Sequence, residues 1–208
     1  MKSSADMTEV DLPIIETGRL LLRMFEVSDL DSMVRLFIDA EVQKYLSPEN
    51  RRTREQMRIT LQNLIRHWKE RGFGLWCVSK KRDNKMLGYC GFQYFDQTSD
   101  REILFAFFKD FWGKGFATEA ADACLKFGFE KLLFERVFAA THPENAASRC
   151  VLEKIGMVCQ EKTTHYGIDT IAYEISRCNF KPSKDFYKLR YENFSYVTSG
   201  SKQDLRVG

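Results

Sequence analysis

No stretch of this 208-residue sequence is apolar for the roughly 18 consecutive residues that a membrane-spanning helix needs. The first thirteen residues, MKSSADMTEVDLP, contain no apolar core, so we expect no secretory signal peptide. Both absences favour a protein of the reducing cytoplasm that has no membrane as a partner.

A zinc-binding pattern is also missing. No two of the six cysteines have CxxC spacing, and the three histidines lie far from any such pair, so we expect no metal site. The residues concerned are Cys77, Cys90, Cys124, Cys150, Cys159 and Cys178, with His67, His142 and His165.

The excess of positive charge is small, a formal net charge of +3 at pH 7. Proteins that bind nucleic acids usually carry a basic patch, and those that stack bases combine it with aromatic residues. The seventeen Phe and eight Tyr residues follow no such repeat, and they predict an aromatic core and pocket. With 44% hydrophobic and 29% charged residues, the composition indicates one globular domain that does not bind nucleic acid.

The apolar pattern divides the chain into one domain and two terminal segments. Residues 1–14 are polar and are expected to form a flexible tail, and residues 15–180 form the domain. Residues 181–208 are a C-terminal extension, in which an alternating stretch at 187–191 is compatible with an extra strand. The last residues, SGSKQDLRVG, are expected to be disordered.

Hydrophobic periodicity within the domain predicts a mixed β-sheet with helices on its faces. Helices are expected to begin near residue 30 and to cover residues 53–71, 116–131 and 145–155. Strands are expected at 19–25, in a hairpin formed by GLWCVSK and MLGYCGFQYF, and at 102–108, 136–141, 157–164 and 169–177.

The most informative segment is EILFAFFKDFWGKGFATEA, a predicted strand followed by a glycine loop and a helix. Gly113 and Gly115 permit positive φ angles and let an anion approach the main chain. Amides of such a loop and of the following helix form a site suited to a pyrophosphate. The phosphate-loop patterns GxxxxGK[ST] and GxGxxG are absent. A tight strand-to-helix turn without a ligand would contain the same glycines.

This segment resembles motif A of the GNAT acetyltransferases, whose pattern is Arg or Gln followed by x-x-Gly-x-Gly/Ala. The matching residues run from Trp112 to Ala117, with Trp112 in place of Arg or Gln. The string Trp-Gly-Lys-Gly-aromatic-Ala-Thr-Glu-Ala is similar to that of the RimJ/RimL-type branch. ETGRLLLRMFEVSDLDSM and ATHPENAASRCVLEKIGM resemble that branch's opening and its second cofactor motif, so the resemblance covers about residues 15–178.

The resemblance implies an α/β fold, a single GNAT domain whose twisted mixed β-sheet is splayed at its centre and flanked by helices. It also implies acetyl-CoA as the co-substrate. The pantetheine would pair with the strand at Phe107 and Phe108, where a backbone N–H would polarise the thioester carbonyl. The residues expected to bind the rest of the cofactor are Trp112, Gly113, Lys114, Gly115, Phe116, Ala117 and Thr118 for the pyrophosphate, with Asn145 and Ser148 near the pantetheine or acetyl group.

Attack of an amine on a thioester needs an acid and a base. Ser148 is the candidate acid, because Leu152 stands where many GNAT enzymes have a tyrosine; alternatively, the Ser148 hydroxyl bonds the start of a helix. Glu102 is the candidate base, with a surface carboxylate at a strand end as the alternative. His165 and Tyr166 are further candidates near the acceptor.

The implied function is acetyl transfer from acetyl-CoA to a primary amine by a monomer or homodimer. A protein N-terminal α-amine is the leading hypothesis for the acceptor, and a small-molecule amine is the alternative. The stretch QKYLSPENRRTREQ is the candidate for one wall of the acceptor site. The rival function is a CoA-binding regulatory or scaffold protein without catalysis, which the missing tyrosine keeps open.

Overall fold

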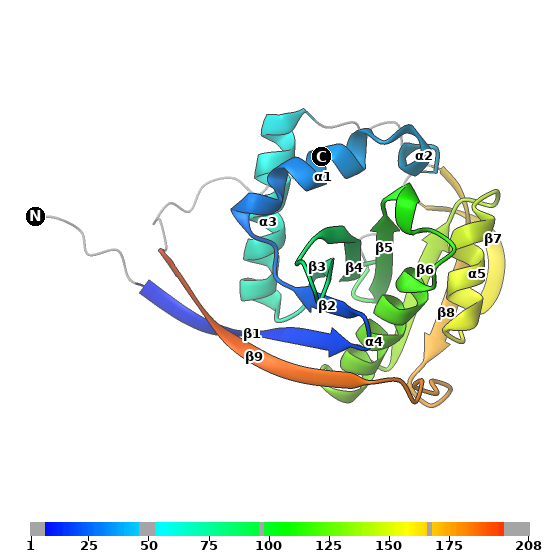
Figure 1. Ribbon diagram of the computed structural model, residues 1–208. Helices are drawn as coiled ribbons and strands as arrows, with labels where there is room; N and C mark the ends of the chain where they lie inside the picture. Colours follow the sequence, from blue (N-terminus) through cyan, green and yellow to red (C-terminus); the bar gives the residue numbers. More distant parts are fainter. Residues whose placement is uncertain (1–6, 46–52, 96–97, 166–167, 198–208) are drawn as a thin grey trace, which may run out of the picture.

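The computed structural model describes residues 7–45, 53–95, 98–165 and 168–197 (Figure 1). The helices are α1 Leu30–Ile38, α2 Ala40–Gln43, α3 Arg54–Arg71, α4 Phe116–Glu130 and α5 Ala146–Lys154. The strands are β1 Met7–Thr17, β2 Leu20–Arg23, β3 Leu75–Lys80, β4 Met86–Tyr94, β5 Arg101–Phe107, β6 Arg136–Thr141, β7 Val158–His165, β8 Ile168–Ser176 and β9 Tyr187–Val197.

The strands form one sheet in the order β7-β8-β6-β5-β4-β3-β2-β1-β9. Neighbouring strands are antiparallel except β5 and β6, which run parallel. Helices α1, α2 and α3 lie on one side of the sheet and α4 and α5 on the other (Figure 1). The predicted mixed sheet with flanking helices is therefore confirmed.

Each helix boundary follows from a local sequence signal. Thr53 caps α3 in a capping box with Gln56, and Gly72 ends the helix with a φ of 71°. Asn145 caps α5 by accepting the amide of Ser148, and Gly156 follows that helix with a φ of 85°. The predicted ranges for α3, α4 and α5 agree with the structure to within about two residues, the usual uncertainty of helix ends.

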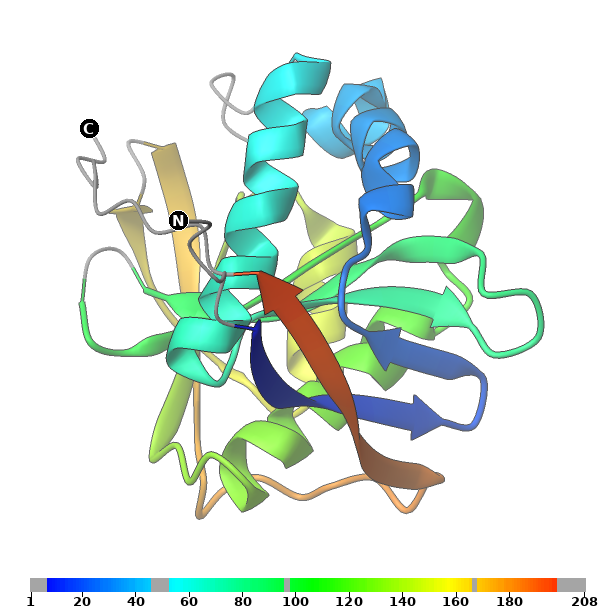
Figure 2. The ribbon, with the colours of Figure 1, turned by 90° about the vertical axis from the view of Figure 1, so that its left-hand side faces the viewer.

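The ribbon of β1 and β9 is the main departure from the expected layout (Figure 2). Residues 7–14, expected in a flexible tail, belong to β1, which pairs with β9 from Met7↔Val197 to Thr17↔Tyr187. Leu12 and Ile15 are buried in the core, which the polar residues around them concealed in the sequence. The extra strand is confirmed as β9. Residues 1–6 and the predicted disordered end at 198–208 lie outside the described residues.

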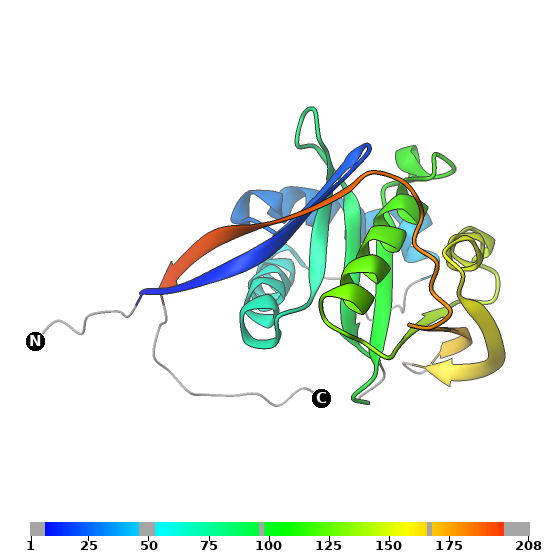
Figure 3. The same ribbon diagram turned by 90° about the horizontal axis from the view of Figure 1, so that it is seen from below.

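The C-terminal extension packs along α4 on its way to β9 (Figure 3). The Phe180 ring lies 5.1 Å from that of Phe129, and the Ser183 amide donates to Asp122 at 3.4 Å. Residues 177–197 therefore complete the domain rather than extend from it.

Two clusters of buried side chains lie on opposite faces of the sheet. The larger one packs α4 and α5 against the sheet and includes Ile103 and Phe107 of β5. The smaller one packs α1 and α3 and includes Leu104 and Ala106, also of β5, at its edge. Strand β5 therefore sends alternate side chains into the two halves of the molecule. Within the described part of the chain, no helix has both the length and the apolarity to cross a membrane.

Candidate active site

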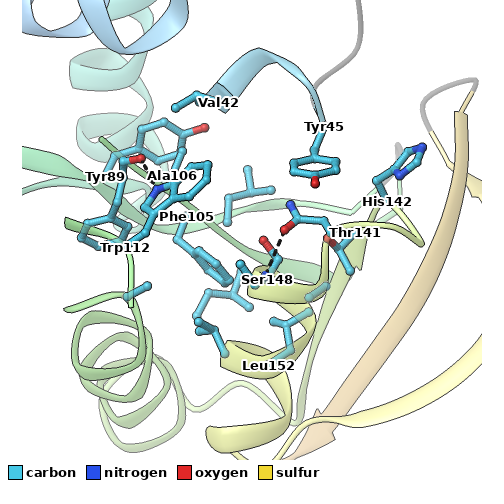
Figure 4. Close-up of a pocket in the computed structure, with 18 of the residues that line it drawn as sticks. Val42, Tyr45, Tyr89, Phe105, Ala106, Trp112, Thr141, His142, Ser148 and Leu152 are labelled. Carbon is cyan, nitrogen blue, oxygen red and sulfur yellow. Dashed lines mark hydrogen bonds between the residues drawn. The ribbon is translucent and has the colours of Figure 1, made fainter. Parts of the chain in front are cut away.

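A cleft of about 670 Å³ opens where β5 and β6 diverge. The register joins these parallel strands at one pair, Glu102↔Phe138. Beyond this pair, residues of both strands line the cleft, among them Phe105 and Phe107 of β5 and Ala140 of β6. Figure 4 shows Val42 and Tyr45 on one side of the cleft and Ser148 and Leu152, on α5, on the other.

The backbone of β5 offers unpaired groups to this cleft. The Phe108 amide donates to the Leu87 carbonyl at 2.9 Å, so it faces β4. Because hydrogen-bonding direction alternates along a strand, the amides of Phe105 and Phe107 face β6 instead. The Phe107 carbonyl accepts the Trp112 indole N–H at 2.7 Å. An extended ligand in the split would therefore meet Phe105 and the Phe107 amide.

The glycine loop adopts the backbone that its sequence predicts. Gly113 and Gly115 have φ angles of 69° and 77°, in the left-handed region that favours glycine. Gly115 is the N-cap of α4 and brings no side-chain cap. The amides of Phe116, Ala117 and Thr118 therefore lack intrahelical acceptors and remain available to an anion at the edge of the cleft.

Arg19 braces this loop from a distant part of the chain. Its guanidinium donates to the Lys114 carbonyl at 2.9 Å and to Glu119 at 2.6 Å, and it lies 4.5 Å from the centre of the Phe116 ring. Thr17 also donates to Glu119, at 2.5 Å. Sequence reasoning missed Arg19, because nothing in the sequence links residue 19 to residue 119.

The start of α5 settles one alternative for Ser148. Asn145, not Ser148, caps the helix, because its Oδ1 accepts the Ser148 amide at 3.0 Å. The half-buried Ser148 side chain lines the cleft, and no described residue forms a hydrogen bond with its hydroxyl. Leu152, one turn further along, is 1% exposed and lines the same wall. Where many related enzymes are expected to have a tyrosine, this wall is apolar, and the serine hydroxyl is the polar group nearby in the helix.

Glu102 is buried, so the alternative of a surface carboxylate is wrong. Its side chain is 1% exposed and lines the cleft. Gln93 donates to Oε2 at 3.0 Å and the Ala140 amide donates to Oε1 at 3.3 Å. Since Leu104 and Ala106 follow it at alternate positions, Glu102 lies on the α1–α3 side of the sheet.

Some predicted site residues lie outside the cleft. Phe108 faces β4 with its amide and packs in the α1–α3 cluster, so the expected pairing of its backbone with the cofactor is a correction to report. Lys114 is exposed, and its Nζ donates to the Asp110 carbonyl at 2.7 Å. His165 packs against Phe95 at 4.5 Å rather than lining the cleft. Tyr166 lies outside the described residues.

Other cleft residues have no signature in the sequence. Tyr45 lines the cleft and lies 5.9 Å, ring to ring, from His142, which lines it too. Tyr45 belongs to the stretch proposed as an acceptor wall, of which residues 46–52 lie outside the described part of the chain. Tyr89 and Gln93 line the cleft from β4. Their strand predicted core positions, and only the sheet shows that they face a cavity.

Comparison with known proteins identifies this arrangement. Residues 19–158 match the model of the acetyltransferase (GNAT) domain. The chain belongs to the GNAT acetyltransferase family. Those residues include β5, the glycine loop, α4 and α5, so the match covers the whole cofactor side of the cleft. The GNAT domain here is that of an N-acetyltransferase, an acyltransferase whose family acts on amines.

Three similar proteins illustrate the range of this GNAT family. The protein YkkB of Bacillus subtilis (strain 168) is 38% identical over 148 residues, which cover 68% of this chain and 83% of YkkB. An acetyltransferase (GNAT family) from Bacillus anthracis has a TM-score of 0.69 and 30% identity, covering 79% of this chain and 98% of that one. RimL, a ribosomal L7/L12 α-N-protein acetyltransferase solved in complex with coenzyme A, has a TM-score of 0.68 and 19% identity, covering 78% and 97%. The RimL likeness is one of fold.

Proposed function

We propose that this protein transfers an acetyl group from acetyl-CoA to a primary amine in the cleft between β5 and β6. One observation carries the proposal. The split between two parallel strands leads directly into a loop with two left-handed glycines at the start of α4. A split strand pair suits an extended amide-containing chain, and the loop suits a pyrophosphate. Coenzyme A contains both.

The residues present fit this cofactor. The pantetheine amides would pair with Phe105 and with the Phe107 amide, the β5 groups that face the split. The pyrophosphate would bind the loop from Gly113 to Gly115 and the first amides of α4, where the helix dipole adds favourable charge. Trp112 would hold the loop on the strand by its bond to Phe107. The RimL neighbour, solved with coenzyme A, supports the choice of ligand.

The proposed chemistry places an acid and a base on the two sides of the cleft. Acetyl-CoA supplies an acetyl group already activated as a thioester. Glu102, on the α1–α3 side, would take a proton from the attacking amine, and Gln93 and the Ala140 amide hold its carboxylate in place. Ser148, on α5, would protonate the leaving sulfur. The Phe107 amide, in the split, is suited to polarising the carbonyl.

We also infer that the chain is of the RimJ/RimL type. The support is the string from Trp112 to Ala121 and the serine at position 148, both typical of that branch. Trp112 replaces the Arg or Gln of the broader family, and its bond to the Phe107 carbonyl gives it a role that either could also fill. Structural neighbours include RimL and a ribosomal-protein-S5-alanine acetyltransferase from Vibrio fischeri, whose acceptors are their own.

The cofactor assignment is tested by titrating coenzyme A, ATP and NAD into the protein while its melting temperature is measured. A ligand that binds the folded state raises Tm in proportion to RT ln(1 + [L]/Kd). We expect a large rise with coenzyme A and a much smaller one with the two nucleotides, which lack pantetheine. No rise at millimolar coenzyme A would overturn the proposal.

Catalysis is tested separately, by release of the thiol from acetyl-CoA over a panel of amines. Amine-dependent thiol release is the expected result. Tight binding of coenzyme A without release by any amine would favour the rival function, a CoA-binding regulatory or scaffold protein.

A further inference from the structure

The half of the cleft on the α1–α3 side is walled almost entirely by apolar side chains. We call it the acceptor chamber and define it by six of its lining residues, Phe37, Val42, Leu64, Tyr89, Leu104 and Ala106. The Phe37 and Tyr89 rings stack, with centres 6.1 Å apart and planes 12° from parallel. Five different elements (α1, α2, α3, β4 and β5) contribute these walls, so the chamber is a preformed feature of the fold.

Polar groups in the chamber are few and are already engaged. Glu102, 1% exposed, lies on this side of the sheet and accepts a hydrogen bond from Gln93. Thr60 of α3 lines the cleft, but its hydroxyl donates to the Gln56 carbonyl at 3.0 Å. The other acidic residue of the lining, Glu41, is half exposed at the rim and pairs with Lys109 at 2.9 Å. The chamber therefore presents one buried carboxylate surrounded by hydrocarbon.

We propose that the acceptor is a compact primary amine with an aromatic or aliphatic body, and this inference rests on the proposed acetyl transfer. The amine would lie toward Glu102 and the body against Phe37, Tyr89 and Leu104. A charged or neutral amine suits a carboxylate, and burial of an apolar body supplies the binding energy.

The same walls disfavour two other classes of amine. A protein N-terminus would place successive backbone amides against hydrocarbon, and each unpaired polar group costs binding energy. A polyamine would place its second cation in the chamber with no second buried carboxylate among the described lining residues. The structure therefore favours the small-molecule alternative over the protein N-terminus for the acceptor.

Four amines test the inference: 2-phenylethylamine, ethanolamine, spermidine and a hexapeptide with a free N-terminal alanine. Binding of each to the coenzyme A-loaded protein is measured by calorimetric titration, and turnover by thiol release from acetyl-CoA. Because burying a phenyl group contributes about as much as any side chain, we expect 2-phenylethylamine to exceed ethanolamine at least about tenfold in affinity and in kcat/KM. Equal or better binding of ethanolamine, spermidine or the peptide would overturn the inference.

The two measurements separate this inference from the proposed function. If 2-phenylethylamine binds selectively but releases no thiol, the chamber assignment stands and the proposed catalysis is wrong. If another amine is acetylated and 2-phenylethylamine is not bound, the catalysis stands and the assignment is wrong.

A pair of matched variants locates the bound body. Ala106→Leu adds bulk beside Tyr89, its cross-strand partner, whereas Ala40→Leu makes the same change at the exposed first residue of α2, outside the cleft lining. Ala106→Leu should weaken 2-phenylethylamine binding roughly tenfold while coenzyme A still binds, which also shows that the variant folds. Ala40→Leu should change neither. Unchanged amine affinity in Ala106→Leu would place the amine elsewhere and refute the assignment.

Discussion

Replacing Gly115 with alanine tests whether the left-handed loop is what binds coenzyme A. An alanine with a φ of 77° is strained by roughly 1–2 kcal/mol relative to glycine. Its Cβ would lie 3.4 Å from Arg19 Nη2 and would meet no closer heavy atom, so strain rather than collision dominates. The loop is exposed and can relax out of the left-handed region when no ligand holds it.

The matched control is Gly72→Ala at the end of α3. Gly72 has nearly the same φ, 71°, and no heavy atom within 4 Å of the added Cβ, but it lies outside the cleft lining. We expect Gly72→Ala to lose about 1 kcal/mol of unfolding free energy with no change in the Kd for coenzyme A. In Gly115→Ala the relaxed loop must be strained again on binding, which raises the Kd about fivefold to tenfold.

Urea unfolding and calorimetric titration of coenzyme A measure the two quantities on both variants. An unchanged Kd in Gly115→Ala would refute the reasoning and show that the loop is a turn without a ligand. A raised Kd in Gly72→Ala would show that general destabilisation, not the loop, controls binding.

Three further changes have distinct expected outcomes. Ser148→Ala should lower kcat about 100-fold with little change in the Kd for coenzyme A, whereas Glu102→Gln should lose most kcat/KM at low pH and recover part of it where free amine is abundant; full kcat in both would rule out this acid–base pair. Arg19→Met should weaken coenzyme A binding several-fold in titrations without unfolding the protein, because half-exposed Arg19 supports the Lys114 carbonyl; unchanged affinity would contradict that role. Burial lowers the pKa of His67 below its ordinary 6.5, so the unfolded chain binds more protons and stability present above pH 6.5 is lost as pH falls through the folded pKa. His67→Phe should reduce the drop in urea midpoint between pH 7.5 and 5.5, and an equal drop would show that other groups cause it.

The features that were predicted correctly are those that short-range chemistry specifies. Thr53 and Gly72 bound α3 because a hydroxyl cap and a left-handed glycine act within one helical turn. Gly113 and Gly115 have positive φ because the loop between β5 and α4 needs that backbone whatever the rest of the chain does. The anion site at the start of α4 was therefore visible in the sequence, and so was the family.

The pairing of distant segments was not visible in the same way. Residues 7–14 contain polar positions that suggest a tail, and they become a strand only because β9 pairs with them along their full length. Edge strands obtain their hydrogen bonds from whichever partner the fold brings alongside, so composition alone does not specify them. Arg19 and Glu119 meet for the same reason, across one hundred residues.

The roles of individual cleft residues depended most on the tertiary structure. A strand sequence shows that side chains alternate, but not which side faces a cavity, so Glu102 could equally have been a surface carboxylate. Likewise, the choice between Phe105 and Phe108 as backbone partners is made by the register with β4. The sequence by itself determined the cofactor loop, because glycine conformation and helix amides are local. Only the fold decided which carboxylate is buried and what kind of acceptor the chamber admits, because burial is set by residues far apart in the chain.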